Sequence, residues 1–160
     1  MNSKIVPLEQ LQTRAAEIRA AGKTLVATNG CFHILHVGHV RYLQAARALS
    51  DVLIVGVNGD ASARELKGPG RPINNENDRA EVVAALDAVN LVTIFPDVRA
   101  TRFLELARPT IYVKGGDYTI DSLNESERKV LEQVGAEIRI IPFEKGYSTS
   151  SLLQKLTSAK

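Results

Sequence analysis

The stretch that decides the fold is residues 24–39, which read TLVATNGCFHILHVGH. It begins at 24–28 with a short apolar run that is partly β-branched, and this pattern predicts a buried strand. The sharp turn Asn29-Gly30 follows. From residue 37 to residue 49 the apolar side chains recur at helical spacing. The stretch therefore predicts a strand, a turn and a helix in immediate succession.

Outward from this unit, apolar runs alternate with amphipathic segments. Further strands are predicted at residues 51–57, 91–95, 109–113 and 136–141. Further helices are predicted at residues 8–21, 79–86, 98–107, 126–134 and 149–156. Strands that are apolar throughout and alternate with helices indicate a parallel sheet covered on both faces. We expect an α/β fold: a Rossmann-like, doubly wound sheet of five parallel strands in a single domain, with an N-terminal helical segment at 1–22.

Polar or glycine-rich loops follow four of the predicted strands. In open parallel sheets the ligand binds beyond the carboxyl ends of the strands. The loops at that edge are residues 29–30, 58–60, 114–117 and 146–150. We therefore expect these four loops to line one site.

Composition excludes several classes of protein. The 160 residues fit one domain, and 44% of them are hydrophobic, which is ordinary for a globular protein. The net charge of +2 is small and the basic residues are scattered, so no nucleic-acid partner is indicated. The single cysteine allows no internal disulfide and indicates a reducing compartment. No apolar stretch approaches the roughly 20 residues of a membrane span. We expect a cytoplasmic protein with no membrane partner.

All three histidines, His33, His36 and His39, lie within seven residues. The spacing of His36 and His39 puts their rings on one side of the first helical turn. Unpaired backbone N–H groups and the helix dipole favour anions there, and Gly38 leaves room for a ligand. The pair suits a polyphosphate whose charge rises during phosphoryl or nucleotidyl transfer. An isolated pair of this kind is more often two surface histidines.

A metal is the alternative explanation of the cluster, because three histidines can form a catalytic zinc site. Residues at i, i+3 and i+6 spread over about a third of the helix circumference, however. His33 is also expected in the turn before the helix, and Cys31 is the one other ligand type nearby. We expect no dedicated metal site, and at most adventitious binding of zinc or nickel.

The run Asn29-Gly30-Cys31-Phe32-x-Ile34-Leu35-His36-x-Gly38-His39 resembles the HxGH signature of the nucleotidylyltransferase superfamily. Within it, the chain is most similar to the cytidylyltransferase-like group that contains the adenylyltransferase domain of ADP-heptose synthase. Further matching motifs follow in the family's order: VNGDAS at 57–62, LKGPGRPIN at 66–74, DRAEV at 78–82, VKGGDY at 113–118 and GYSTS at 146–150. The resemblance implies a nucleotidyltransferase domain at 23–160.

The resemblance implies that AMP is transferred from ATP, with Mg²⁺ as cofactor, to a sugar 1-phosphate. The expected acceptor is D-glycero-β-D-manno-heptose 1-phosphate, and pyrophosphate leaves without a covalent enzyme intermediate. An alternative in the same class is transfer from CTP to a polyol phosphate such as glycerol 3-phosphate. An alternative of another class is a nucleotide-binding regulatory protein without turnover. The resemblance also implies a homodimer and, since relatives often carry a sugar kinase domain for which this chain has no room, a separate kinase upstream.

Roles for the motif residues follow from the same resemblance. His36 and His39 would donate to the phosphates, Lys67 in a flexible loop would close over the triphosphate, and Arg79 would bind the same phosphates. These four are the expected catalytic residues. The expected nucleotide-binding residues are Asn29, Gly30, Cys31, Phe32, His33, Gly38, Lys114, Gly116, Asp117, Tyr147, Ser148, Thr149 and Ser150. The expected substrate-binding residues are Asn58, Asp60 and Arg71.

Plainer roles remain open for several of these residues. Lys67 fits a solvated loop lysine, Arg79 fits a helix-surface residue, and Asp117 fits a turn cap. Ser148 or Thr149 fits a helix N-cap. Cys31 is expected to pack as a small side chain rather than act as a nucleophile.

The chain departs from the family's pattern in two places. His33 stands where the family has an aspartate, and histidine is a poorer ligand for Mg²⁺ than a carboxylate oxygen. Residues 119–128 also differ, and we expect this segment to shape the acceptor pocket.

Overall fold

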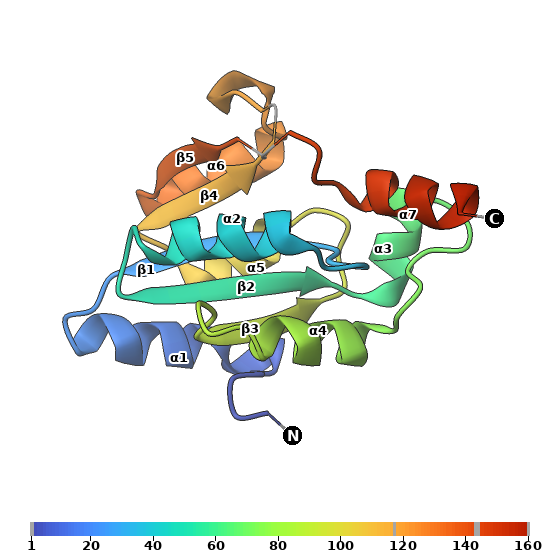
Figure 1. The fold of residues 1–160 in the computed structure, drawn as a ribbon. Coiled ribbons are helices and arrows are strands. Elements are labelled where there is room, and N and C mark those ends of the chain that lie inside the picture. Colours follow the sequence, from blue (N-terminus) through green and yellow to red (C-terminus); the bar gives the residue numbers. More distant parts are fainter. Residues whose placement is uncertain (1, 117, 143–144, 160) are drawn as a thin grey trace.

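The computed structural model describes residues 2–116, 118–142 and 145–159, and it has the predicted α/β fold (Figure 1). One sheet holds five strands in the order β3-β2-β1-β4-β5, and all neighbours are parallel. The strands are β1 (Leu25–Gly30), β2 (Val52–Asn58), β3 (Leu91–Phe95), β4 (Ile111–Gly115) and β5 (Glu137–Ile141).

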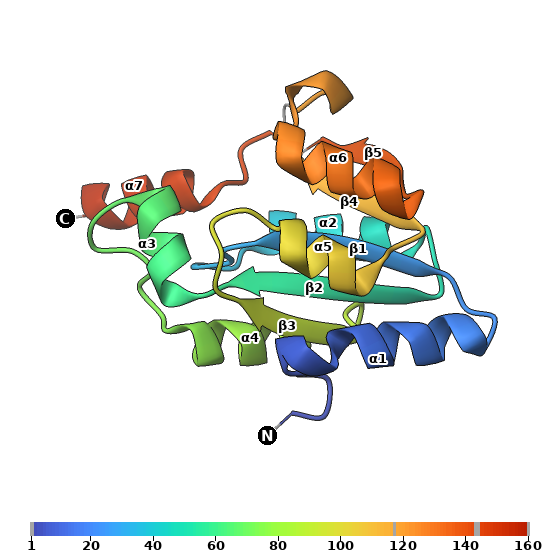
Figure 2. The ribbon, with the colours of Figure 1, turned by 180° about the vertical axis from the view of Figure 1, so that it is seen from behind.

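Helices cover both faces of the sheet (Figures 1 and 2). One face carries α1 (Leu8–Ala20), α5 (Thr101–Ala107) and α6 (Glu125–Val134). The other face carries α2 (Val37–Arg47) and α4 (Glu76–Ala84). Beyond the carboxyl ends of the strands lie α3 (Asp60–Lys67) and α7 (Thr149–Ser158). The predicted doubly wound arrangement is therefore confirmed.

Each face of the sheet has its own apolar core. Leu11 of α1 and Phe103 of α5 belong to one core, and Leu43 of α2 and Val83 of α4 belong to the other. The N-terminal segment joins the body through α1 and through a parallel bridge between Ile5 and Val92. Within the described ranges, no helix combines the length and the apolar character needed to cross a membrane.

Two elements are absent from the sequence prediction. The helix α3 has only eight residues, most of them polar, and is shorter than the window over which helical spacing is recognised in a sequence. It places Lys67 at the end of a helix, which corrects the prediction of a flexible loop position. The short 3₁₀ helix η1 (Ile120–Ser122) is held by a capping box between Thr119 and Ser122.

Some boundaries also differ from the prediction. Helix α4 begins at Glu76 rather than at Arg79, because the Asn75 side chain accepts the backbone N–H of Asp78 and caps the helix there. Strand β4 begins two residues later than predicted, at Ile111, since Pro109 has no N–H for a ladder hydrogen bond. Helix α5 begins at residue 101 rather than at 98.

Candidate active site

The strands β1 and β4 pair over only part of their length, and a crevice opens between their carboxyl ends. Their register comprises Val26 with Ile111 and Ala27 with Tyr112. The strand order also reverses here, because the chain runs one way from β1 to β3 and the other way from β4 to β5. Open parallel sheets bind ligands at such a switch point. The topology therefore places the ligand site between the ends of β1 and β4.

Two tyrosine hydroxyls bridge this crevice. The hydroxyl of Tyr42 lies 2.6 Å from Oγ1 of Thr28 in β1 and donates at 3.1 Å to the carbonyl of Val113 in β4. The hydroxyl of Tyr112 donates to Oδ1 of Asn29 at 2.7 Å. Burial raises the pKa of both phenols, so both keep their protons. These bonds hold the two strand ends at a fixed separation.

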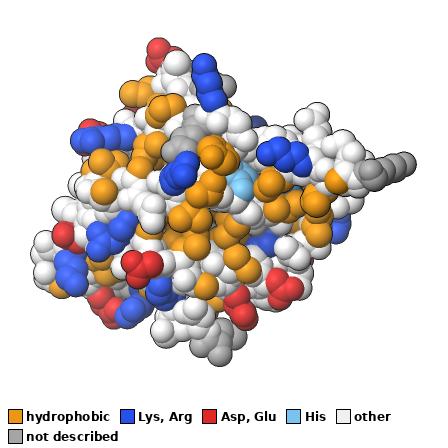
Figure 3. Space-filling model, in the orientation of Figure 1, with side chains coloured by type: hydrophobic (Ala, Val, Ile, Leu, Met, Phe, Trp, Pro, Cys, Tyr) orange, Lys and Arg blue, Asp and Glu red, His pale blue; other side chains and the backbone are white. Residues whose placement is uncertain are grey.

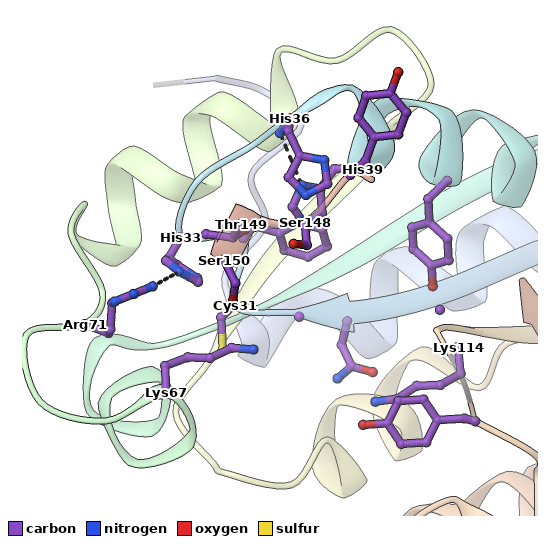
Figure 4. A pocket seen from close by; sticks show the side chains of 17 residues that line it. Cys31, His33, His36, His39, Lys67, Arg71, Lys114, Ser148, Thr149 and Ser150 are labelled. Atoms are coloured by element: carbon purple, nitrogen blue, oxygen red, sulfur yellow. Dashed lines mark hydrogen bonds between the residues drawn. The ribbon is translucent and has the colours of Figure 1, made fainter. Parts of the chain in front are cut away.

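A cavity of about 460 Å³ occupies the crevice (Figure 4). Its walls come from the ends of β1 and β4, the loop before α2, the end of α3 and the start of α7. The lining residues are Asn29, Gly30, Cys31, Phe32, His33, His36, His39, Tyr42, Lys67, Arg71, Lys114, Gly115, Tyr118, Tyr147, Ser148, Thr149 and Ser150. Three of the four predicted loops, 29–30, 114–117 and 146–150, contribute lining residues. The loop 58–60 contributes none, which corrects the prediction, and Lys67 and Arg71 supply that part of the wall instead.

The rings of His36 and His39 lie 4.0 Å apart, centroid to centroid, at the start of α2. His36 is the N-cap of the helix, and its Nδ1 accepts the backbone N–H of Gly38 at 3.0 Å. Nδ1 of His39 accepts the backbone N–H of His36 at 3.3 Å. A ring nitrogen that accepts carries no proton, so each neutral ring bears its proton on Nε2. The capping arrangement therefore presets both rings as Nε2–H donors.

Burial keeps both rings neutral. Desolvation lowers the pKa of His36, and it lowers the pKa of His39 from 6.5 to about 4, with smaller contributions from neighbouring histidines and Lys67. At neutral pH the pair offers two uncharged N–H donors rather than two positive charges. Fixed donors of this kind stabilise charge that develops on a phosphate in the transition state.

Gly38 is required by the packing of the His36 ring. A Cβ at this position would lie 2.8 Å from ring atoms of His36 and 3.0 Å from Cβ of Tyr147. The sequence predicts that Gly38 leaves room for a ligand. In the structure that space is filled by His36 and Tyr147, and Gly38 lies behind the lining.

The start of α7 faces the same cavity. Ser148 is the N-cap, and its Oγ accepts the backbone N–H of Ser151 at 3.0 Å. The Thr149 hydroxyl donates to the carbonyl of Ile34 at 3.2 Å, which fastens α7 to the loop before α2. Hydroxyls together with the unpaired N–H groups of a helix start bind anions. This end of the cavity is therefore suited to phosphate oxygens.

Three cationic side chains also line the cavity: Lys67, Arg71 and Lys114. Nζ of Lys114 lies 4.9 Å from the ring centroid of Tyr118. Among the residues that the structure describes, the lining contains no carboxylate. The charge of the cavity therefore favours an anion that carries several negative charges.

His33 differs from the other two histidines in its partner. It is 7% exposed, and its Nε2 contacts Nη1 of Arg71 (Figure 4). A guanidinium can only donate, so Nε2 accepts and the neutral ring carries its proton on Nδ1. Burial and then the charge of Arg71 lower the pKa of His33. His33 therefore orients an arginine and does not present an Nε2–H donor.

Arg79 lies outside the cavity, and the structure does not bring it to the expected phosphate site. It is 2% exposed. Its guanidinium donates to the carbonyls of Cys31 at 2.6 Å, Asn58 at 2.8 Å and Asn74 at 3.0 Å, and to the carboxylate of Asp60 at 2.8 Å. These oxygens belong to segments after β1, at the end of β2, at the start of α3 and before α4. Arg79 joins the loops that surround the site.

The expected acceptor residues Asn58 and Asp60 also lie outside the cavity lining. Asn58 is 2% exposed and donates at 3.3 Å to Oγ of Ser62 and to the carbonyl of Asp97. Asp60 is the ion-pair partner of Arg79. Gly116 is buried next to the lining, and Asp117 lies outside the described residues.

Three lining residues are missing from the predicted set: Tyr42, Gly115 and Tyr118. Tyr42 follows His36 and His39 at the same three-residue spacing, so extending the helical pattern by one step finds it. Gly115 and Tyr118 belong to the motif at 113–118.

The free thiol of Cys31 is buried, and burial raises its pKa. A protonated thiol is a weak nucleophile, which agrees with a packing role. Over the ranges 2–116, 118–142 and 145–159, no group of three His, Cys, Asp or Glu side chains is placed to hold a metal ion.

Comparison with known proteins gives consistent matches. A family model described as cytidylyltransferase-like matches residues 27–155. The chain is 42% identical over 158 residues to Bifunctional protein HldE of Geobacter sulfurreducens and 48% identical over 149 residues to that of a Bradyrhizobium species. These matches cover 99% and 93% of this chain but 32% and 30% of the relatives. The chain therefore spans about a third of their length.

Two solved structures are similar in fold. The lipopolysaccharide core biosynthesis protein from Thermoplasma volcanium has a TM-score of 0.64 and 28% identity, covering 79% of this chain and all of that one. Pantoate-beta-alanine ligase from Francisella tularensis has a TM-score of 0.63 and 16% identity, covering 96% of this chain and 73% of that one. The second likeness bears on the fold alone.

Proposed function

The chain belongs to the cytidylyltransferase-like family of nucleotidyltransferases, and we propose that it transfers AMP from ATP to a sugar 1-phosphate. One observation carries the proposal. The preset Nε2–H donors of His36 and His39 share a cavity with the start of α7 and with three cationic side chains. Groups of each of these kinds can donate to phosphate oxygens, which supports the proposal.

In the proposed reaction an oxygen of the acceptor phosphate attacks the α-phosphorus of ATP. A new P–O bond forms while the bond from the α-phosphorus to the bridging oxygen breaks, and pyrophosphate leaves with the electron pair. The acceptor phosphate is mostly ionised at pH 7, since its second pKa is about 6, so the protein need not remove a proton from it. The work of the protein is to position the two reactants and to offset negative charge.

Negative charge grows on the leaving pyrophosphate as the bond breaks. His36 and His39 are already held as donors by the backbone of α2, so they need no rearrangement when that charge develops. Lys67, Arg71 and Lys114 supply positive charge around the same space. We assign the hydroxyls and N–H groups at the start of α7 to the triphosphate. Arg79 acts as a positioning residue that holds the surrounding loops.

Mg²⁺ is proposed to arrive bound to the phosphates of ATP. Magnesium sites in phosphate chemistry usually combine phosphate oxygens with one or two carboxylates. The described part of the lining offers no carboxylate, and His33 stands where the resemblance leads us to expect one. These residues do not fit a Mg²⁺ ion held by the protein.

For the acceptor we propose D-glycero-β-D-manno-heptose 1-phosphate. Support comes from the resemblance to the adenylyltransferase domain of ADP-heptose synthase and from similarity to a lipopolysaccharide core biosynthesis protein. This acceptor requires a sugar kinase that acts before the enzyme. The cytoplasm is the proposed compartment because both steps consume ATP.

A substrate panel tests the proposal. The protein is incubated with Mg²⁺, each nucleoside triphosphate in turn, and a set of sugar and polyol phosphates, and pyrophosphate release is measured. We expect release with ATP and the heptose 1-phosphate. Release with CTP and glycerol 3-phosphate alone would replace the proposal with the polyol alternative. Tight nucleotide binding without release in any combination would replace it with a regulatory binding protein.

We also propose that the enzyme is a homodimer. Hydrophobic side chains gather on the face shown in Figure 3. Among the exposed large hydrophobic residues are Val82 of α4 and Leu156 of α7, at 51% and 71% exposure. A second copy of the chain would cover such a patch. Light scattering should give twice the mass of one chain, and Leu156→Glu should weaken the dimer. A monomeric wild-type protein would contradict this proposal.

A further inference from the structure

A second cavity, of about 270 Å³, adjoins the first. It is lined by Arg99, Lys114, Tyr118, Ser122, Leu123, Asn124 and Glu127. Two of these residues, Lys114 and Tyr118, line both cavities. The remaining wall comes from the turn after β3, the segment between β4 and α6, and the first turn of α6. A reaction that joins two substrates needs two adjoining compartments with the reacting groups where they meet.

The hydrogen bonds already made by Asn124 and Glu127 leave one donor and one acceptor in the second cavity, which suits the binding of hydroxyl groups. Oδ1 of Asn124 caps α6 by accepting the backbone N–H groups of Ser126 at 3.1 Å and Glu127 at 3.3 Å. Its amide Nδ2 is the donor that the cap does not use. Glu127 is 7% exposed, and its Oε1 accepts the backbone N–H of Ala100 at 2.8 Å. The second carboxylate oxygen is a further acceptor. A donor beside an acceptor matches neighbouring hydroxyls of a sugar ring.

Charge separates the two cavities. The first has three cationic side chains and the start of α7, and its described lining has no carboxylate. The second has two cationic side chains, Arg99 and Lys114, and the buried carboxylate of Glu127, so it attracts a polyphosphate less than the first does. Arg99 adds a guanidinium whose N–H groups can donate to hydroxyls. The nucleotide is therefore favoured in the first cavity, and a ligand with many hydroxyls is favoured in the second.

Building on the proposed function, we propose that the second cavity binds the sugar ring of the acceptor, with its 1-phosphate at Lys114 where the two cavities meet. Asn124, Glu127 and Arg99 are then the residues that distinguish a sugar from a smaller polyol. Ser122, Leu123, Asn124 and Glu127 all belong to the segment 119–128, in which the sequence departs from the family pattern.

The test uses two substitutions in the second cavity. Asn124→Asp keeps the capping oxygen, because aspartate caps helices as well as asparagine does, and removes the Nδ2 donor. Arg99→Gln removes the guanidinium of an exposed side chain. Each variant is expected to raise the KM for heptose 1-phosphate by about ten-fold, because each loses one hydrogen bond to the sugar. The KM for ATP should stay within about two-fold of the wild-type value, since the cavity proposed for ATP is unchanged.

Arg102→Gln is the matched control. Arg102 is an exposed residue of α5 outside both linings, so this variant should leave both KM values unchanged.

Equal KM values for heptose 1-phosphate in the wild type and both variants would overturn the inference while leaving adenylyl transfer intact. A parallel rise in the KM for ATP would overturn it too, because the substitutions would then act on the whole site. Calorimetric titration of heptose 1-phosphate into protein saturated with a non-hydrolysable ATP analogue measures the affinity for the acceptor without turnover. If the wild type binds heptose 1-phosphate and both variants bind it more weakly, the inference is supported even if no pyrophosphate is released. Absence of binding to the wild type contradicts it, whereas pyrophosphate release with another acceptor would still support nucleotidyl transfer.

Discussion

The start of α2 and the loop before it hold the same side chain in opposite states. At the start of α2, backbone N–H groups occupy Nδ1 of His36 and His39, so Nε2 carries the proton and remains for a substrate. In the loop, Arg71 occupies Nε2 of His33, so the proton lies on Nδ1. The hydrogen-bond partner of one ring nitrogen therefore decides whether the other nitrogen of a histidine can donate to a substrate.

The two regions also differ in how firmly the ring is held. The partners of His36 and His39 are backbone atoms of the helix in which these residues lie, so the donors form whenever the helix forms. The partner of His33 is the end of a long side chain from a separate loop. We therefore expect the helix start to carry catalysis and the loop to tolerate change.

The largest effect is expected from His39→Ala. It removes one preset donor, and losing a single donor of this kind usually costs about 10²–10³-fold in kcat. Pyrophosphate release under saturating substrate measures kcat, and a thermal unfolding curve checks that the fold is intact. His33→Ala, measured in parallel, should lose only about ten-fold, the worth of one hydrogen bond to a charged group. Equal losses in the two variants would erase the distinction between the regions.

A smaller effect is expected from Gly38→Ala. The new Cβ would lie 2.8 Å from the His36 ring, so the ring must move and its bond to the Gly38 N–H must lengthen. We expect a loss of about ten-fold or more in kcat, because catalytic geometry tolerates little displacement. Gln44→Ala, an exposed position farther along α2, is the control and should keep full activity. Full activity of Gly38→Ala would show that the ring position of His36 does not matter.

The strand and the helix start within 24–39 can be predicted from the sequence, because apolar runs and helical spacing are local signals. The predicted turn Asn29-Gly30 is wrong, since both residues extend β1 and pair with β2. The pairing of His33 with Arg71 cannot be predicted from local signals, since it depends on a loop 38 positions away along the chain. Arg79 shows the same limit, for its burial is decided by four oxygens from segments that only the fold brings together. Lys67 lines the cavity, but it lies at the end of α3, whose eight residues are too few for helical spacing to be recognised from the sequence. Local pattern thus predicts most of the segments that reach the site. Long-range contacts decide which side chains enter the cavity, since Arg79, Asn58 and Asp60 lie outside it.

Acid should destabilise the protein partly through His39. Its pKa is about 4 in the folded state and ordinarily 6.5, so between these values the unfolded chain binds the proton and the folded chain does not. Stability is therefore complete above pH 6.5 and falls as the pH drops toward 4. Urea unfolding of the wild type and of His39→Gln across this range gives the contribution of His39 as the difference between the two curves. The decline should be shallower in the variant, and parallel curves would contradict the buried neutral state.

The smallest effect is expected from His33→Asp. A carboxylate accepts from Arg71 as Nε2 of His33 does, so the arginine keeps its partner. The exchange also restores the acid that the family resemblance leads us to expect, and Lys67 and Arg71 offset the added negative charge. Turnover should be retained or raised, and any loss should stay below about ten-fold, because one acceptor replaces another. If His33→Asp instead lost as much activity as His39→Ala, the neutral ring of His33 would itself be needed, and the loop could no longer be distinguished from the helix start.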